Sequence, residues 1–236
     1  MRCLFQRDEE AEVMGQQVKL KSSDGKEIGG YLAEPKAAPK AGIVVIQEIF
    51  GVNHHMRNVT DRFAADGYLA LAPAMFDRLK PGVELGYVAP DMQAGRELAG
   101  QLKPEMILAD VQGAIDYLRK AGCKKVGIVG YCFGGTVAWR AAASLDVDAA
   151  VGYYGGGIYA ARELKPKVPT MLHFGDQDAG IPNEQVAEVK KMHPDVPVHV
   201  YHAGHGFHCD ERASYDEASA KQAYTRTLEF FAKHLA

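Results

Sequence analysis

Six uninterrupted apolar runs, separated by helical patterns, limit most strongly what this chain can fold into. The runs lie at residues 42–46, 68–72, 126–129, 149–154, 170–174 and 198–201. Strands that are buried on both faces have this composition, because helices cover each side of their sheet. The alternation of such strands with helices predicts an α/β fold built on a doubly wound, mainly parallel sheet.

The ends of the helical segments carry residues that favour helix termini. Asn53 is the expected N-cap of a helix closed by Gly67, and Pro104 opens a second helix. Asn183 is the expected N-cap of a third helix. Each helix follows an apolar run, which agrees with crossover connections between parallel strands.

A short antiparallel element is expected before the parallel sheet. Residues 16–21 alternate polar and apolar side chains, Asp24 and Gly25 supply a turn, and residues 27–33 are again extended. This pattern predicts an N-terminal hairpin. At the other end of the chain, residues 215–235 are amphipathic and can cover one sheet face.

Length and composition indicate one globular unit. With 236 residues, 47% of them hydrophobic, the chain can bury the core of a single α/β domain, expected at residues 14–236. Residues 1–13 are a candidate N-terminal extension, with the start at Met1 or Met14. The four cysteines are irregularly spaced in a chain of this size, so we expect reduced thiols.

Charge and hydropathy patterns argue against two kinds of partner. The net charge is −3, and no basic run is interleaved with aromatic residues, so we expect no nucleic acid. No apolar segment approaches the ~20 residues that cross a bilayer, and no secretory signal is evident. We therefore expect a cytoplasmic protein without membrane contact, as a monomer with weak homo-oligomerisation left open.

The run from Gly130 to Gly135 (G-Y-C-F-G-G) has the form of a G-x-S-x-G nucleophile elbow, with cysteine in place of serine. In such an elbow a buried strand turns sharply into a helix, and the central residue is held in a strained conformation that faces a pocket. Residues 125–130 are the expected strand and residues 136–143 the expected helix. Cys132 is therefore the candidate nucleophile of an acyl transfer.

Two later segments supply a carboxylate and a histidine for this thiol. Asp176 and Asp178 follow the fifth apolar run, and Asp178 is the stronger candidate because it directly precedes the turn toward the next helix. His205 follows the last run and has a glycine on each side. The order cysteine, aspartate, histidine is that of α/β-hydrolase triads. Each residue alone has an ordinary structural explanation, but their joint occurrence favours a triad.

The segment Q-E-I-F-G-V-N, which begins at Gln47, follows the first apolar run, where a second oxyanion donor is expected. We assign the two donors to the backbone N–H groups of Ile49 and Phe133. Glu48 stands at the end of a buried strand, where an unpaired carboxylate is costly. We expect it to belong to the site, with a structural ion pair as the alternative.

Together these residues resemble the dienelactone hydrolase family. The resemblance is carried by Q-E-I-F-G-V-N, G-Y-C-F-G-G, the Y-Y-G of Tyr153 to Gly155, and A-G-H-G-F, and it runs from about residue 42 to the C-terminus. It implies the α/β-hydrolase fold and the hydrolysis of a small-molecule lactone or ester. It also implies that Glu48 helps to ionise the thiol when substrate arrives. The implied site residues are the triad Cys132, Asp178 and His205, the carboxylate Glu48, and the oxyanion donors Ile49 and Phe133.

The residues that would select the substrate match the family less well. Members of chlorocatechol pathways bind the lactone carboxylate with arginines, one of them shortly after the catalytic histidine. Here His208, Cys209 and Asp210 occupy that place. The candidate substrate-binding residues are Arg78, Arg96, Arg212 and Tyr87.

A thiol nucleophile also restricts the reaction. A tetrahedral adduct on sulfur readily expels the thiolate, so turnover through a thioester acyl-enzyme favours substrates whose own leaving group is stabilised. Enol lactones, aryl esters and thioesters qualify, whereas plain amides do not. We expect no cofactor.

Two other functions stay open at this stage. His202, His205, His208 and Cys209 form a dense cluster of metal-ligand types, although their spacing is not a common zinc signature and we expect no metal. Alternatively, the scaffold is non-catalytic and binds a ligand or responds to redox change, with Cys132 as the sensor thiol.

Overall fold

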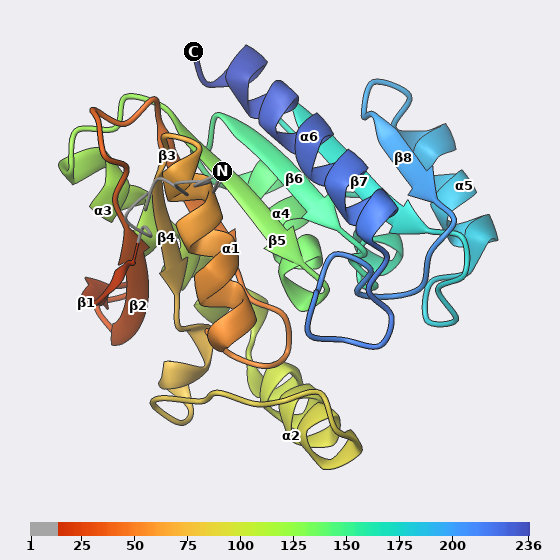
Figure 1. The fold of residues 1–236 in the computed structure, drawn as a ribbon, viewed down its shortest axis with the longest axis horizontal. Helices are drawn as coiled ribbons and strands as arrows, with labels where there is room; N and C mark the ends of the chain where they lie inside the picture. Colours follow the sequence, from red (N-terminus) through yellow and green to blue (C-terminus); the bar gives the residue numbers. More distant parts are fainter. Residues whose placement is uncertain (1–13) are drawn as a thin grey trace, which may run out of the picture.

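Eight strands form one sheet in the computed structural model, which describes residues 14–236 (Figure 1). In chain order the strands are β1 (Gln16–Lys21), β2 (Glu27–Ala33), β3 (Gly42–Ile46), β4 (Leu69–Pro73), β5 (Val126–Tyr131), β6 (Ala149–Tyr153), β7 (Thr170–Gly175) and β8 (Val198–Tyr201). Their spatial order is β1-β2-β4-β3-β5-β6-β7-β8. β2 pairs antiparallel with both β1 and β4, and the other neighbours are parallel. The predicted sheet and its N-terminal hairpin are confirmed.

Six α-helices and two short 3-10 helices connect the strands within the described residues. They are α1 (His54–Ala65), η1 (Met75–Arg78), α2 (Ala89–Gln101), α3 (Pro104–Lys120), α4 (Phe133–Ser144), η2 (Tyr159–Ala161), α5 (Asn183–Met192) and α6 (Glu217–His234). The candidate extension at residues 1–13 lies outside the described residues, so the division of the chain into an extension and one domain stays a prediction.

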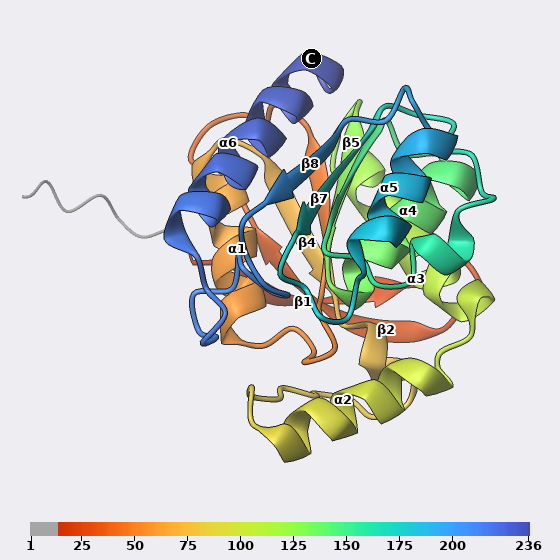
Figure 2. The ribbon, with the colours of Figure 1, turned by 90° about the vertical axis from the view of Figure 1, so that its right-hand side faces the viewer.

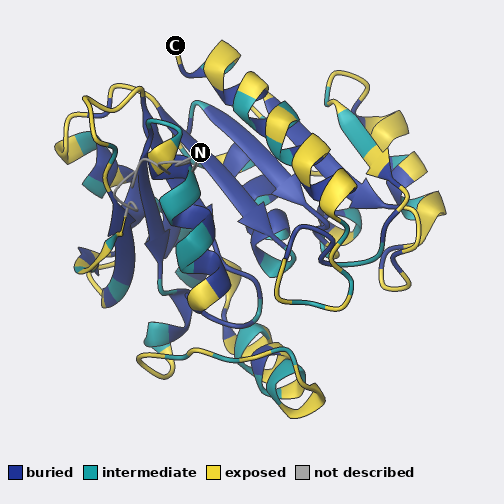
Figure 3. Cartoon of the chain, viewed as in Figure 1, coloured by how far each residue is buried: buried dark blue, intermediate teal, exposed yellow. Residues whose placement is uncertain are grey.

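The helices form two layers around the sheet. α1 and α6 cover one face, α3, α4 and α5 cover the other, and α2 lies beyond the edge of the sheet (Figures 1 and 2). Side chains of β3 alternate between the layers: Ile43 and Val45 join the core that contains Phe63 of α1, while Val44 joins the core that contains Ile115 of α3. The strands from β3 to β7 are buried, whereas the edge strands β1 and β8 are partly exposed, and other exposed residues gather on the outer sides of the helices (Figure 3).

The parallel strands bring distant parts of the chain to one edge of the sheet. β3, β5, β6, β7 and β8 run in the same direction, so their carboxyl ends lie together. Ligand and active sites of open α/β sheets are built at this edge. The segments predicted to supply the triad, Glu48 and the oxyanion donors follow these strands, whereas the candidates Arg78, Tyr87 and Arg96 follow β4.

One local prediction is wrong, and one helix was not predicted. Asn183 is the first residue of α5, and its N-cap is Pro182; the Asn183 side chain instead donates 3.1 Å back to the carbonyl oxygen of Asp176. The helix α2 was not expected. Gly95 is the one buried residue of α2. A helix that buries so little of its surface needs no apolar stripe, and such a stripe is the pattern by which a helix is recognised in a sequence.

Candidate active site

Cys132 lies between β5 and α4 in a backbone conformation that few residues other than glycine adopt, with φ 54° and ψ −113°. Glycines make this sharp turn sterically possible. A Cβ at Gly130 would stand 1.9 Å from the carbonyl oxygen of Gly134, and a Cβ at Gly134 would stand 2.4 Å from that of Ile46. The chain therefore forms the predicted elbow, with a half-buried thiol at the start of α4.

His205 bridges the thiol and a buried carboxylate. Its Nε2 is 3.1 Å from Sγ of Cys132, and its Nδ1 is 2.6 Å from Oδ2 of Asp178. The Asp178 side chain is 1% exposed and that of His205 is 29% exposed. Burial lowers the pKa of His205, but the hydrogen bonds to Asp178 and Cys132 outweigh burial and raise it to about 10. The arrangement can hold an imidazolium beside the sulfur.

The two aspartates after β7 differ in surroundings. The second oxygen of Asp178, Oδ1, accepts a 2.8 Å hydrogen bond from the backbone N–H of Gly180, which fixes the carboxylate. Asp176 instead lies 3.2 Å from His202, whose side chain is 80% exposed. The structure therefore brings Asp178, and not Asp176, to His205.

The backbone N–H groups of Ile49 and Phe133 belong to neighbouring segments. The close approach of Gly134 to the carbonyl oxygens of Ile46 and Gln47 presses the start of α4 against the end of β3. Among the described residues, neither N–H donates to a protein acceptor. Phe133 is also the first residue of α4, where the helix dipole favours negative charge.

Glu48 is a buried carboxylate with one partner. Its side chain is 1% exposed, and Oε1 lies 3.4 Å from Nη1 of Arg212. Within residues 14–236 the other oxygen, Oε2, has no hydrogen-bond partner. Burial alone would lower the pKa of Arg212, but the charge of Glu48 and other nearby groups outweigh burial and raise the pKa of Arg212. A carboxylate that is half satisfied in this way has the capacity to accept a further hydrogen bond.

Arg212 lies across the backbone beside the histidine. A Cβ at Gly206, where φ is +78°, would stand 2.3 Å from Nη1 of Arg212, so a side chain there would displace the guanidinium. The guanidinium carbon is 5.7 Å from the ring centre of Phe50 and 5.9 Å from that of Tyr87. Burial raises the pKa of Tyr87, whose hydroxyl accepts a 3.0 Å hydrogen bond from Asn53. Arg212 and Tyr87 therefore lie together near Glu48.

Comparison with known proteins agrees with this geometry. The model of the dienelactone hydrolase family matches residues 28–235. The chain belongs to the dienelactone hydrolase family. A carboxymethylenebutenolidase from Pseudomonas putida is 36% identical over 227 residues, which cover 91% of this chain and 95% of the relative. A protein from Synechocystis sp., provisionally given the same name, is 39% identical over 228 residues, or 89% and 93% of the two chains.

A solved structure shows the same relationship. A Klebsiella pneumoniae protein, provisionally named a dienelactone hydrolase, matches with a TM-score of 0.80 and 29% identity, over 92% of this chain and 99% of that one. The predicted α/β-hydrolase fold is thereby confirmed, and the chain is a hydrolase of ester or lactone bonds.

The dienelactone hydrolase fold places Arg78 and Arg96 differently from Arg212. Arg78, at the end of η1, forms ion pairs of 2.8 Å with Asp110 and with Asp24, and its side chain is 8% exposed. These contacts are structural, and the expectation that Arg78 binds substrate is not supported by them. Arg96 is exposed on α2.

The histidines after β8 do not converge on one point. His202 is exposed, whereas His208 is buried with its ring 5.1 Å from that of Tyr131. Burial lowers the pKa of His208 well below its usual range. Across residues 14–236, no three His, Cys, Asp or Glu side chains are grouped so that they could hold a metal ion. The rival metal site of His202, His205, His208 and Cys209 is therefore not formed by this dienelactone hydrolase fold.

One further residue, Tyr154, lies beside the site. Tyr154 has an unusual φ of 37°, and its buried ring lies 5.1 Å from that of His205; in the sequence it was noted only as part of the Y-Y-G motif, with no role assigned.

In residues 14–236, none of the helices combines the length and the hydrophobicity that a membrane span requires.

Proposed function

We propose that this hydrolase cleaves an enol lactone or an activated ester through a thioester on Cys132. The observation that carries the proposal is the position of His205, with Nε2 3.1 Å from the sulfur and Nδ1 2.6 Å from Asp178. The raised pKa of His205 supports an imidazolium beside the sulfur, and this favours the thiolate, the nucleophilic form of cysteine.

In the first step the sulfur attacks the carbonyl carbon, and the proton from the thiol resides on Nε2 of His205. The bond from the carbonyl carbon to the leaving oxygen then breaks, and that oxygen takes the proton from Nε2. In the second step Nε2 takes a proton from water as its oxygen attacks the thioester. The carbon–sulfur bond breaks, and the proton returns to the sulfur. Asp178 holds the imidazole in the orientation that both steps need.

The backbone N–H groups of Ile49 and Phe133 stabilise the oxyanion in both steps. Their lack of protein acceptors among the described residues supports this role, because an oxyanion can then bind without breaking an existing hydrogen bond. Removing one such donor typically costs about 10²- to 10³-fold in rate.

The substrate carries a carboxylate near the carbonyl that reacts. Arg212 is the cation available to bind it, because its guanidinium lies 3.4 Å from Glu48 and against Gly206, next to His205. A substrate carboxylate would compete with Glu48 for Arg212, and the released Glu48 would then help to ionise the thiol. The relative from Pseudomonas putida is named for cleaving a carboxymethylenebutenolide, a lactone of this kind.

Mass spectrometry of single-turnover mixtures tests the proposal. With an aryl ester, we expect an acyl adduct on Cys132 that accumulates in His205→Ala, because water is no longer activated. A panel with one acyl group and enol-lactone, aryl-ester, alkyl-ester and amide leaving groups should show turnover falling in that order. Full turnover by Cys132→Ala, or fast amide hydrolysis, would contradict the mechanism. Reversible oxidation of Cys132 with no turnover on any activated ester would favour a redox-responsive protein.

A further inference from the structure

The loop between β8 and α6 carries Arg212, and it is tied to the first turn of α1. We call residues 206–216 the arginine loop. It is ordered internally by successive turns, in which the N–H of Arg212 donates 3.1 Å to the carbonyl of Cys209 and the N–H of Tyr215 donates 3.0 Å to that of Arg212. Phe207, His208 and Cys209 at the start of the loop are buried against the rest of the molecule, whereas Asp210 and Glu211, which follow them, are exposed.

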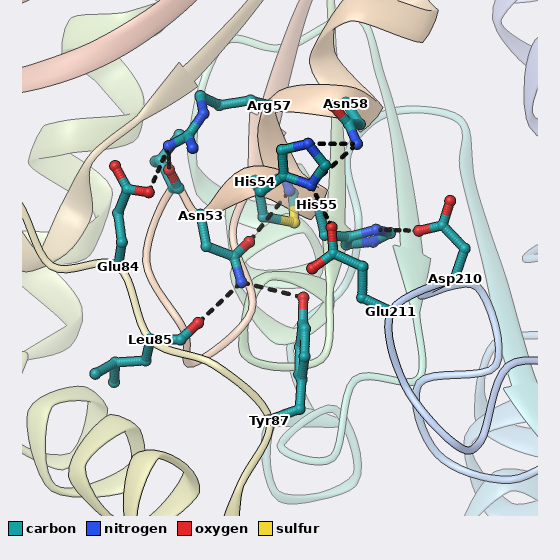
Figure 4. A network of polar contacts seen from close by, with 12 residues as sticks. Asn53, His54, His55, Arg57, Asn58, Glu84, Leu85, Tyr87, Asp210 and Glu211 are labelled. Carbon is teal, nitrogen blue, oxygen red and sulfur yellow. Dashed lines mark hydrogen bonds and ion pairs between the residues drawn. The ribbon is translucent and has the colours of Figure 1, made fainter.

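Two adjacent histidines of α1 attach the exposed part of the loop that leads to Arg212 (Figure 4). His55 Nδ1 lies 2.9 Å from Oδ1 of Asp210, and His54 Nδ1 lies 2.5 Å from Oε1 of Glu211. The two contacts differ in burial. The His55 side chain is fully buried, whereas that of His54 is 71% exposed.

The same turn of α1 also holds the opposite side of the site. Asn53, the N-cap of α1, accepts from the N–H of Met56 through Oδ1 and donates through Nδ2 to the hydroxyl of Tyr87 at 3.0 Å. It also donates to the carbonyl of Leu85 at 3.1 Å (Figure 4). Tyr87 and Arg212, which flank Glu48, lie on different segments. The start of α1 contacts both segments, through Asn53 on one side and His55 on the other.

We propose that His55 is a positioning residue for Arg212. By holding Asp210, two residues before Arg212, it fixes the arginine loop so that the guanidinium reaches across Gly206 to Glu48. This inference deepens the proposed function, because it rests on the roles of Arg212 and Cys132 given above.

We assign this role to His55 rather than His54 because the side chain of His55 is buried and that of His54 is exposed. An ion pair between exposed side chains contributes little, because water and salt screen it and two mobile side chains must be ordered. A hydrogen bond to a fully buried ring is different. The ring of His55 is fully buried, and its edge packs against the buried His208 of the same loop at 6.2 Å, so its Nδ1 presents Asp210 with a partner at a defined place.

The test compares two alkylating reagents that differ by one negative charge. Iodoacetate carries a carboxylate and iodoacetamide does not, so the ratio of their rate constants at Cys132 reports the cation beside the thiol. Rates are measured at one pH and ionic strength by mass spectrometry of the Cys132 peptide, with Arg212→Met as the reference for loss of the cation. We expect the ratio to be about 3- to 10-fold higher in the natural protein than in this reference.

In His55→Phe, which keeps a ring but loses the donor, the ratio should fall to the Arg212→Met value. His55→Asn should restore it, because Nδ2 of asparagine can take the place of Nδ1. Asp210→Ala removes the acceptor from an exposed position and should lower the ratio even if His55→Phe does not fold. His54→Ala is the matched control and should keep the natural ratio.

An unchanged ratio in folded His55→Phe or Asp210→Ala would overturn the proposal, as would an equal fall in His54→Ala. The proposed hydrolase mechanism fails by a separate result. If the alkylation ratios at Cys132 follow the expected pattern but Cys132→Ala still hydrolyses esters at the natural rate, the positioning role of His55 stands and the thioester mechanism is wrong.

Discussion

The hydrogen bond between Asp178 and His205 is the main interaction that raises the pKa of His205 above its ordinary value. The bond is short, 2.6 Å, and its carboxylate is 1% exposed, so water cannot replace it. A hydrogen bond that involves a charged partner contributes about 1.5–3 kcal/mol. Because one pKa unit corresponds to about 1.36 kcal/mol, Asp178→Asn should lower the pKa of His205 by about 1 to 2 units from its value of about 10.

The same substitution should change how stability depends on pH. The pKa of His205 is raised in the folded state above the ordinary value of 6.5, so its contribution to stability is fully present below pH 6.5. That contribution is lost as the pH rises from 6.5 to about 10. In Asp178→Asn the free energy of unfolding should therefore fall less steeply across this window than in the natural protein.

NMR titration of the His205 ring, together with urea unfolding at pH 6 and pH 10, measures both effects. Asp176→Asn is the matched control, because Asp176 pairs with exposed His202 and not with His205. We expect the control to leave both measurements unchanged. The kcat of Asp178→Asn should also fall, by up to about 10⁴-fold, because asparagine does not favour the required tautomer. A His205 pKa within a few tenths of a unit of the natural value in Asp178→Asn would refute this reasoning.

Three further substitutions test other parts of the structure. Arg78→Met should lower the free energy of unfolding by about 3–5 kcal/mol in urea, because it leaves the fully buried Asp110 carboxylate without its ion-pair partner, while the KM of the folded enzyme stays the same. Gly206→Ala should displace Arg212 and raise the KM for esters that carry a carboxylate several-fold, and it should also cost about 1–2 kcal/mol of stability because φ is +78°. Glu48→Gln should change the pH profile of thiol alkylation; an unchanged profile would return Glu48 to a purely structural role.

The sequence was most informative where local rules decide the structure. Buried strands have continuous apolar runs, and the glycines around Cys132 are needed for a turn whose steric limits are local. The carboxyl ends of parallel strands meet at one edge, so Asp178 and His205 could be expected near the thiol from their order alone.

The rest depended on contacts that sequence spacing does not encode. Arg212 meets Glu48 across 164 positions, and Arg78 meets Asp110 across 32. An arginine of either kind looks the same in the sequence, because only the folded chain decides which carboxylate it reaches. His55 is a comparable case, since its partner Asp210 is 155 positions away.

The helix α2 contacts the rest of the molecule next to Ile49, one of the two proposed oxyanion donors. Gly95, its one buried residue, lies against the carbonyl oxygen of Ile49, where a Cβ would stand 2.1 Å away. The peptide plane that carries this oxygen adjoins the proposed oxyanion donor, while the helix itself buries little apolar surface and so has low local stability. Heat should therefore detach α2 and disturb residue 49 while the sheet is still folded. Thermal loss of turnover is expected at a lower temperature than thermal loss of the fold.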